Sequence, residues 1–207
     1  MRSQVRILSP RQKIHARLVN RLNNSFPSCE EGFDSPTSLP KMELYSIWII
    51  PPESFYSKIE KTINFLCKKY KGPVFEPHMT LLRNIEMPLS QLVQKTKKLA
   101  ESTKPFIISS GQVSFSTTYF QSVLLRINSS AKLMQLNLNA KKLTGKENDV
   151  FMPHISLLYG DHEMGVRQSI ASGVIFPKIS FMAEKFTITP STNDPLEWEH
   201  VAEIPFG

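Results

Sequence analysis

The sequence predicts an α+β fold, and three observations support this class. Segments rich in β-branched and aromatic residues alternate with segments whose apolar residues recur every three or four positions. Proline and glycine pairs, such as Pro51-Pro52 and Gly72-Pro73, separate these segments. One short stretch also occurs twice, which indicates an internal duplication. Strands and helices interleaved along one chain are typical of an α+β domain.

The first half of the main region is predicted to hold two strands and two helices. Residues 44–50 read LYSIWII, a β-branched and aromatic run that predicts a strand. Residues 53–70 carry apolar side chains at i, i+4 spacing and predict a helix. A second strand is expected over 78–82. A second helix is expected over 90–100, with Ser90 as its N-cap.

The second half continues the same alternation. A tight connection between two strand patterns predicts a hairpin, and a helix and a further strand follow it. Two closing strands are expected near the end, with a less regular helical stretch before them. The expected elements are strands over 106–115 and 119–127, a helix over 131–143, a strand over 154–158, a helix near 166–171, and strands over 178–188 and 198–204.

Composition and charge divide the 207 residues into two parts. Residues 1–41 hold seven Lys or Arg against three Asp or Glu, and the rest holds 18 against 15. Residues 1–41 are also rich in Asn, Ser and Pro, so we expect a disordered or non-native extension there. Residues 42–207 are expected to form one domain. Their small charge excess favours a small anionic substrate over a long nucleic acid.

Two further expectations follow from composition. No apolar run approaches the roughly 20 residues that span a bilayer, so no membrane partner is expected. Cys29 and Cys67 lie far apart and have no metal-ligand spacing, so two reduced thiols in a cytoplasmic protein are expected.

The duplicated stretch carries the candidate catalytic residues. Residues 75–82 read FEPHMTLL and residues 151–158 read FMPHISLL, with five of eight positions identical. Proline favours extended backbone, so each copy predicts the start of a strand. Residues i and i+2 of a strand share a face. His78 and Thr80 therefore point the same way, as do His154 and Ser156.

Two imidazoles and two hydroxyls in one pocket predict phosphoryl chemistry. Histidine can accept or donate a proton near neutral pH, so a pair supplies a general base and a general acid. Hydroxyl groups can stabilise the charge that develops on phosphate oxygens. A strained cyclic phosphodiester suits this set: one histidine activates water and the other protonates the departing oxygen. No metal and no cofactor are expected for this reaction.

Other interpretations of the histidines are less favoured. A single buried histidine is usually a core residue, but the repeated context of His78 and His154 argues against that explanation for the pair. Two histidines alone are too few for a stable zinc site, although Asp161 and His162 follow the second copy closely. His15, His162 and His200 have no repeated context and are expected to be solvated polar residues.

The paired His-x-Thr/Ser motifs resemble the signature of the two-histidine (2H) phosphoesterase superfamily. The nearer likeness is to its cyclic phosphodiesterase branch of plants and yeast, and it covers about residues 42–205. Besides the two motifs, the segments that carry the likeness are Tyr45-Ser46-Ile47-Trp48, Gly72-Pro73, Phe120-Gln121, the motif extension to Tyr159, and Trp198-Glu199 with Val201-Ala202.

The resemblance implies a fold and an activity. The fold would be bilobal, with two small antiparallel sheets flanked by helices around a central cleft. The activity would open 2′,3′-cyclic nucleotides to nucleoside 2′-phosphates, and ADP-ribose 1″,2″-cyclic phosphate to ADP-ribose 1″-phosphate. By position, Trp48, Phe120 and Tyr159 would contact substrate, which is compatible with aromatic stacking on bases. Trp198 is assigned to packing.

Two alternatives remain open. The first is an enzyme of RNA ends, either a 2′,3′-cyclic phosphodiesterase or a 2′–5′ RNA ligase-like enzyme, for which Arg83 and Arg126 would be the candidate phosphate contacts. The second is an inactive RNA-binding module, which the intact histidine and hydroxyl of both copies disfavour. A monomer acting on a small cyclic-phosphate nucleotide is the preferred interpretation.

Overall fold

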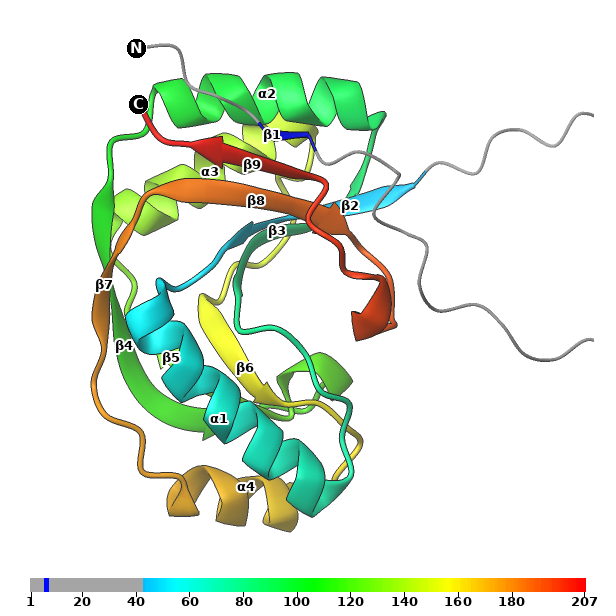
Figure 1. The fold of residues 1–207 in the computed structure, drawn as a ribbon, viewed down its shortest axis with the longest axis vertical. Coiled ribbons are helices and arrows are strands. Elements are labelled where there is room, and N and C mark those ends of the chain that lie inside the picture. Colours follow the sequence, from blue (N-terminus) through cyan, green and yellow to red (C-terminus); the bar gives the residue numbers. More distant parts are fainter. Residues whose placement is uncertain (1–5, 8–42) are drawn as a thin grey trace, which may run out of the picture.

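The computed structural model of the chain describes residues 6–7 and 43–207, and these residues form four α-helices and nine strands (Figure 1). The helices are α1 (Glu53–Tyr70), α2 (Leu89–Glu101), α3 (Ala131–Thr144) and α4 (Met164–Gly173). The strands are β1 (Arg6–Ile7), β2 (Leu44–Ile49), β3 (Met79–Glu86), β4 (Phe106–Phe115), β5 (Val123–Ile127), β6 (His154–Leu158), β7 (Ser180–Ala183), β8 (Lys185–Pro190) and β9 (Ala202–Pro205).

The strands form one curled antiparallel sheet with the order β1-β9-β8-β2-β3-β6-β5-β4-β7. The sheet has two halves that meet where β3 pairs with β6. Strands β1, β9, β8, β2 and β3 belong to the first lobe, and β6, β5, β4 and β7 belong to the second. One residue pair, Met79 with Ile155, joins β3 to β6. Figure 1 shows the halves one above the other, with β8 bending down into β7 along the left side.

Each half of the sheet has its own pair of helices. In the first lobe, α2 packs on β8 and β9, and α3 packs on β3 and α2. In the second lobe, α1 packs against β6, and α4 packs against β4 and β5. The predicted α+β, two-lobed fold is therefore confirmed. The two expected sheets are the halves of one continuous sheet.

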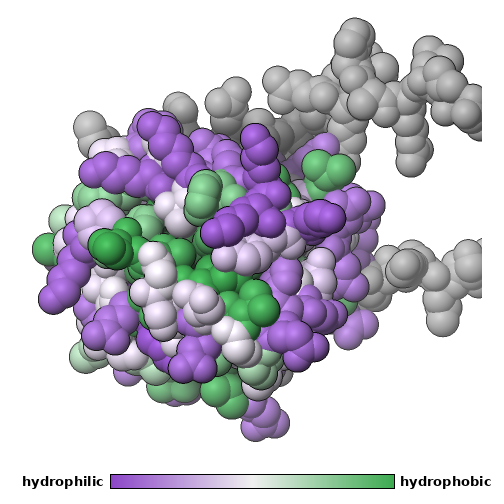
Figure 2. Space-filling view, turned by 90° about the horizontal axis from the view of Figure 1, so that it is seen from below, coloured by the Kyte–Doolittle hydropathy of each residue, from purple (hydrophilic) through white to green (hydrophobic). Residues whose placement is uncertain are grey.

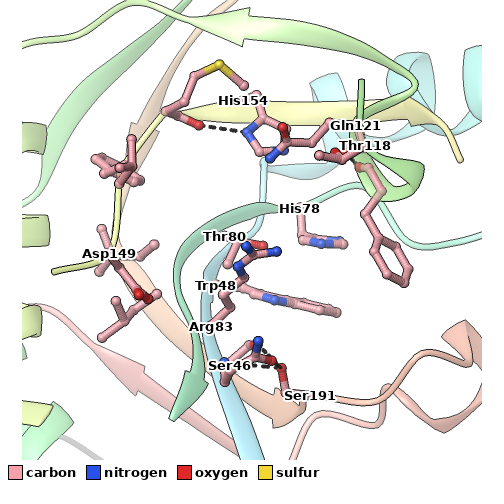
Figure 3. A pocket seen from close by; sticks show the side chains of 18 of the residues that line it. Ser46, Trp48, His78, Thr80, Arg83, Thr118, Gln121, Asp149, His154 and Ser191 are labelled. Atoms are coloured by element: carbon pink, nitrogen blue, oxygen red, sulfur yellow. Dashed lines mark hydrogen bonds between the residues drawn. The ribbon is translucent and has the colours of Figure 1, made fainter. Parts of the chain in front are cut away.

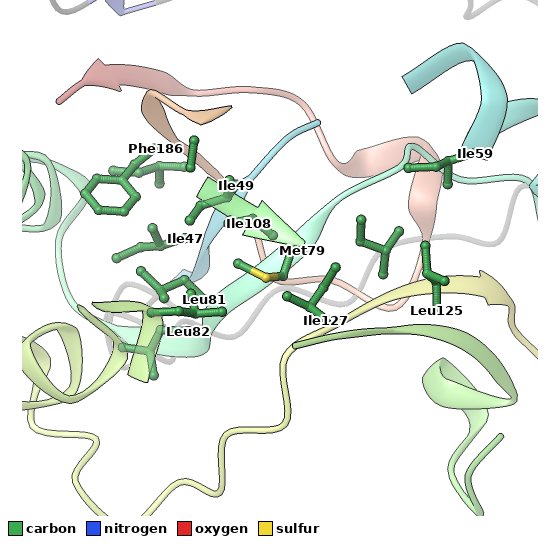
Figure 4. Close-up of a cluster of buried hydrophobic side chains, with 14 of the residues drawn as sticks. Ile47, Ile49, Ile59, Met79, Leu81, Leu82, Ile108, Leu125, Ile127 and Phe186 are labelled. Carbon is green, nitrogen blue, oxygen red and sulfur yellow. The ribbon is translucent and has the colours of Figure 1, made fainter. Parts of the chain in front are cut away.

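Apolar side chains from the strands and from one side of each helix pack together in the core (Figure 4). Ile59, Ile63 and Leu66 of α1 lie one turn apart and are fully buried. Met79 and Ile155, the pair that joins the halves, are both completely inaccessible to solvent. Each such side chain contributes roughly 1.5–3 kcal/mol when removed from water, so the junction of the lobes is an apolar core.

Four predicted elements differ most from the structure. Of the closing strand expected over 198–204, only the last part is in β9, Ala202–Pro205. Helix α2 begins at Leu89 after Pro88, and no side chain caps it, so Ser90 is not the N-cap. Residues 119–121 form a short 3₁₀-helix, and β5 begins only at Val123. The strand expected over 178–188 is divided at Glu184, because β7 pairs with β4 of the second lobe and β8 pairs with β2 of the first.

The N-terminal region is described only at Arg6–Ile7, which pair antiparallel with β9. The prediction of a disordered or non-native extension over 1–41 otherwise lies outside the described residues. Within the described part of the chain, no helix is long and apolar enough to cross a membrane.

The face shown in Figure 2 is mostly hydrophilic, but a group of apolar side chains is exposed on it. This view looks from the side on which α4 lies in Figure 1. Among the described residues, the large apolar side chains that are exposed include Phe65 on α1, Met164 and Val166 on α4, and Ile175 just after α4.

Candidate active site

The two repeated histidines lie at the junction of the lobes and line one cavity (Figure 3). His78 immediately precedes β3, and His154 is the first residue of β6. Met79 and Ile155 follow them and turn into the core, so alternation along the strands turns the imidazoles to the opposite, cavity side. The structure thus brings His78 and His154, predicted from the two duplicated segments, to one cavity.

Both imidazoles are held by the same backbone contact. His78 Nδ1 lies 2.7 Å from the Glu76 carbonyl oxygen, and His154 Nδ1 lies 2.7 Å from the Met152 carbonyl oxygen. A carbonyl oxygen can only accept, so Nδ1 carries the proton in each ring. The Nε2 atom of each neutral imidazole is therefore free to accept a proton from a ligand.

The hydroxyls of the two motifs also line the cavity. Thr80 is half-buried on β3, two residues after His78. Ser156 is buried, and its Oγ donates to the Phe120 carbonyl oxygen at 2.8 Å. The Ser156 hydroxyl must therefore turn away from Phe120 before it can donate to a bound phosphate.

Aromatic rings enclose the histidine end of the cavity. Trp48 stacks on the His78 ring with centroids 3.7 Å apart and an interplanar angle of 8°. Trp198 meets both rings edge-on, at 5.5 Å from Trp48 and 5.6 Å from His78. Tyr159 stacks on Phe75 at 3.7 Å. These contacts immobilise His78 between two tryptophans and leave little freedom for its ring.

The three aromatics expected to contact substrate, Trp48, Phe120 and Tyr159, all line the cavity. Trp48 and Tyr159 are only 3% and 2% exposed, whereas Phe120 is half-buried and meets Tyr159 edge-on. Trp198, which was assigned to packing, lines the cavity as well.

Burial and nearby charges lower the pKa of both histidines and so favour their neutral form. Burial lowers the pKa of His78 to about 3, against the opposing effect of the Glu76 carbonyl, and His154 and His200 lower it further. Burial also lowers the pKa of His154, with added repulsion from Arg83 and Arg126 and opposition from the Met152 carbonyl. An anionic phosphate between the rings would favour the charged form and draw a proton onto one of them.

Arg83 reaches the cavity because β3 is irregular. The pairing of β2 with β3 shifts register twice, between Tyr45 and Ile47 and again between Ile47 and Trp48. Asn84 adopts a left-handed conformation with φ of 52° within this stretch. Extra residues in one strand change which side chains share a face, so Thr80 and Arg83 both line the cavity.

The far end of the cavity holds polar residues that the sequence interpretation missed. Asn137 and Lys141 are buried on α3 and line the cavity. Asn137 donates to the Leu81 carbonyl oxygen at 2.7 Å, and the Lys141 ammonium donates to the Asp149 carbonyl oxygen. The sequence contains a pattern that could have predicted their burial. Asn137 and Lys141 follow Leu133 at intervals of four residues, so they lie on the apolar side of the predicted helix.

Two histidines outside the repeat are not solvated as expected. His200 Nε2 lies 2.7 Å from Glu76 Oε2, so this side chain is paired and partly buried. His162 Nε2 is buried without a hydrogen-bond partner among the described residues, and its ring meets Tyr70 edge-on at 6.2 Å. His15 lies outside the described residues.

The remaining expectations concern metals and cysteines. Over residues 6–7 and 43–207, no group of three or more His, Cys, Asp or Glu side chains is placed to hold a metal ion. Cys67 is a buried free thiol, and burial raises its pKa to about 11. Cys29 lies outside the described residues.

The cavity has a volume of about 650 Å³, within the usual range of about 300–1,000 Å³ for small-molecule sites. Residues 42–203 match the cyclic phosphodiesterase-like protein family. The chain belongs to this family. The membership confirms the resemblance seen in the sequence and the enzyme class that it implies, a phosphodiesterase.

Individual relatives are distant. A cyclic phosphodiesterase of Arabidopsis thaliana is 25% identical over 122 residues, which span 58% of this chain and 67% of the relative. E. coli LigT, solved with NADP⁺, shares 15% identity and a TM-score of 0.52 over 80% of this chain and 98% of its own. The protein TT0787 of Thermus thermophilus shares 15% identity and a TM-score of 0.54 over 79% of this chain and 97% of its own. The solved structures match in fold.

Proposed function

We propose that this phosphodiesterase hydrolyses cyclic phosphodiesters without a metal ion, by general acid and base catalysis from His78 and His154. The observation that carries the proposal is the matched pair of imidazoles, each with Nδ1 bonded to a backbone carbonyl and Nε2 free in one cavity. Both rings are presented to a single ligand in the same tautomer. This arrangement supplies one proton acceptor and, once protonated, one proton donor.

The proposed reaction is an attack of water on the cyclic phosphorus. One neutral histidine takes a proton from the water as the new P–O bond forms. The other histidine, protonated when the phosphate binds, gives its proton to the ribose oxygen as that P–O bond breaks. Thr80 and Ser156 donate to the non-bridging oxygens, and the charges of Arg83 and Arg126 support the growing negative charge.

The proposed substrates are small cyclic nucleotides: 2′,3′-cyclic nucleotides, opened to 2′-phosphates, and ADP-ribose 1″,2″-cyclic phosphate, opened to the 1″-phosphate. The cavity volume supports a nucleotide-sized ligand, and the Arabidopsis relative is named a cyclic phosphodiesterase. Trp48, Phe120 and Tyr159 would contact the ribose or the base. We further propose that the enzyme acts as a cytosolic monomer.

RNA ends are a second candidate substrate, and one observation favours them. Arg83 and Arg126 both act on the pKa of His154, so two guanidinium groups lie near the catalytic centre. Additional phosphates of an RNA strand would interact with such charges. An enzyme of RNA ends would use the same histidines and hydroxyls on a longer substrate.

The test is hydrolysis of 2′,3′-cyclic AMP by the full chain in EDTA, with identification of the product isomer. We expect the 2′-phosphate from the wild type, and a loss of about 10²–10⁴-fold in kcat for His78→Ala and for His154→Ala. Gln94→Ala, at an exposed position of α2, serves as the matched control and should retain full activity.

Other outcomes have definite meanings. Failure to hydrolyse any cyclic nucleotide or ADP-ribose cyclic phosphate would contradict the proposal. Hydrolysis of cyclic phosphates on RNA ends alone would favour the second candidate. Binding of RNA without any hydrolysis would favour the alternative that the protein is an inactive RNA-binding module.

A further inference from the structure

The two copies of the motif differ most at the residue before proline. Glu76 occupies this position in the first copy and Met152 in the second. In both copies the backbone carbonyl of this residue accepts the hydrogen bond from the histidine Nδ1. The backbone geometry of the two copies is thus the same, and only the first copy adds a carboxylate behind its histidine.

The Glu76 side chain contacts both lobes. His200, on the connection that leads into β9 of the first lobe, places Nε2 2.7 Å from Glu76 Oε2. Tyr56, on α1 of the second lobe, also hydrogen-bonds Glu76, and burial together with this carboxylate raises the pKa of Tyr56 to about 12. The residue that anchors His78 is therefore itself held from two sides.

The charges around His200 favour its protonated form. The hydrogen bond that His200 donates to Glu76 raises the pKa of His200 most, burial opposes it, and the charges of Glu76 and Glu203 add to the rise. Lys185 lowers it slightly and is itself bonded to Glu203 at 2.8 Å. In its protonated form His200 donates a charge-assisted hydrogen bond to the Glu76 carboxylate, which is stronger than one between neutral groups.

We infer that Glu76 and His200 are a positioning pair for His78: by fixing the Glu76 backbone they hold the carbonyl that locks the His78 ring, and they do so for His78 alone. Neither residue lines the cavity, so neither is expected to touch substrate. At the matching position the Met152 sulfur accepts only a long hydrogen bond from Arg126, at 3.5 Å, so His154 has no carboxylate and histidine pair behind it. The kinetic part of this inference rests on the proposed function, whereas the hydrogen bond itself can be tested without activity.

The direct test is NMR of the imidazole protons in the full-length protein. The exchange of the His78 Nδ1 proton with water reports how firmly its hydrogen bond is held, and the His154 Nδ1 proton is an internal control. We expect His200→Ala and Glu76→Met to speed exchange at His78 about tenfold and to leave His154 unchanged. Glu76→Met gives the first copy the residue of the second, so it removes the carboxylate with little change in volume.

Kinetics give the second readout. His200→Ala is expected to lower kcat on 2′,3′-cyclic AMP about tenfold with little change in KM, because the pair orients His78 and does not bind substrate. His200→Gln keeps an N–H donor for Glu76 and is expected to recover part of kcat. The double variant Glu76→Met with His200→Ala should be no slower than either single variant, because the two residues act as a unit.

Two outcomes would overturn the inference. One is unchanged exchange at His78 in both Glu76→Met and His200→Ala. The other is equal acceleration at His78 and His154, which would indicate general loosening of the fold. A wild-type protein without activity would contradict the proposed function but leave the exchange comparison intact, so the two failures are distinguishable.

Discussion

At the scale of single residues, the site depends on which atom of each side chain faces the cavity. The sequence predicted that His78 and His154 share a pocket with Thr80 and Ser156, because strand alternation fixes the direction of alternate side chains. It could not predict that the Ser156 hydroxyl donates to the Phe120 carbonyl, because that contact spans 36 residues of sequence. The pairing of His200 with Glu76 was likewise invisible, since it spans 124 residues.

The two motif hydroxyls are expected to differ in what their loss does to stability. Thr80→Val and Ser156→Ala should each lower kcat about 10²-fold, because each removes one donor to the phosphate oxygens. Ser156→Ala also removes the hydrogen bond to the partly buried Phe120 carbonyl, which costs about 0.5–1.5 kcal/mol. Thermal unfolding should therefore show a lower Tm for Ser156→Ala and a nearly unchanged Tm for Thr80→Val. Equal Tm values for both variants would contradict the hydrogen bond to Phe120.

The low pKa of His78 predicts acid sensitivity. Its folded-state pKa of about 3 lies below the ordinary value of 6.5, so the unfolded chain binds the extra proton first as pH falls. The stability that the neutral ring contributes is complete above pH 6.5 and is lost between pH 6.5 and 3, with a slope of at most about 1.4 kcal/mol per pH unit. Urea unfolding should show that His78→Gln flattens this slope. An identical slope in wild type and variant would contradict the burial of a neutral imidazole.

At the scale of elements, the sequence predicted the bounds of those helices and strands whose ends depend on local residues. The helix over 53–70 and the strands over 106–115 and 154–158 have the expected bounds. Their ends are marked by proline, glycine or a change of periodicity. The strand expected over 178–188 was wrong as one unit, because its division at Glu184 depends on two different pairing partners. Partner choice is a tertiary property that no local run of residues encodes.

In the connection between α1 and β3, the backbone at Gly72 lies close to Leu158 and Tyr159. A Cβ added there would lie 2.8 Å from the Tyr159 carbonyl oxygen and 3.0 Å from a Leu158 methyl group. Gly72→Ala should therefore push against the end of β6, lower the free energy of unfolding by about 1–3 kcal/mol and disturb Tyr159 in the cavity. Gly165→Ala in α4 is the matched control, because its Cβ meets nothing within 4 Å. Chemical unfolding that ranks the two variants in the opposite order would contradict the packing described.

At the scale of the whole molecule, the duplication brings the two histidines to the junction of the lobes. The lobes join at the pair Met79 and Ile155, and the two histidines precede the two members of that pair. The two-lobed arrangement followed from the family resemblance. The sequence did not reveal that the lobes share one sheet. It also did not reveal that the connection between β8 and β9 brings His200 to Glu76 of the first motif.

The modest charge of residues 42–207 predicts a weak salt dependence for small substrates. A cyclic nucleotide brings one phosphate charge to the site, so its KM should rise by at most about tenfold between about 50 and 500 mM salt, a slope of at most about one on a double logarithmic plot. A much steeper slope with an RNA substrate, together with a lower KM, would show that several phosphates are bound and would favour the RNA-end alternative.

The central claim is that His78 and His154 act as one acid and one base, and the pH dependence of kcat on 2′,3′-cyclic AMP in EDTA tests it most directly. The wild type should give a bell-shaped profile, since one histidine must be neutral and the other protonated in the bound complex. His78→Ala and His154→Ala should each lower the maximum and abolish a different limb of the bell. A residual activity that keeps both limbs in either variant would contradict the two-histidine mechanism.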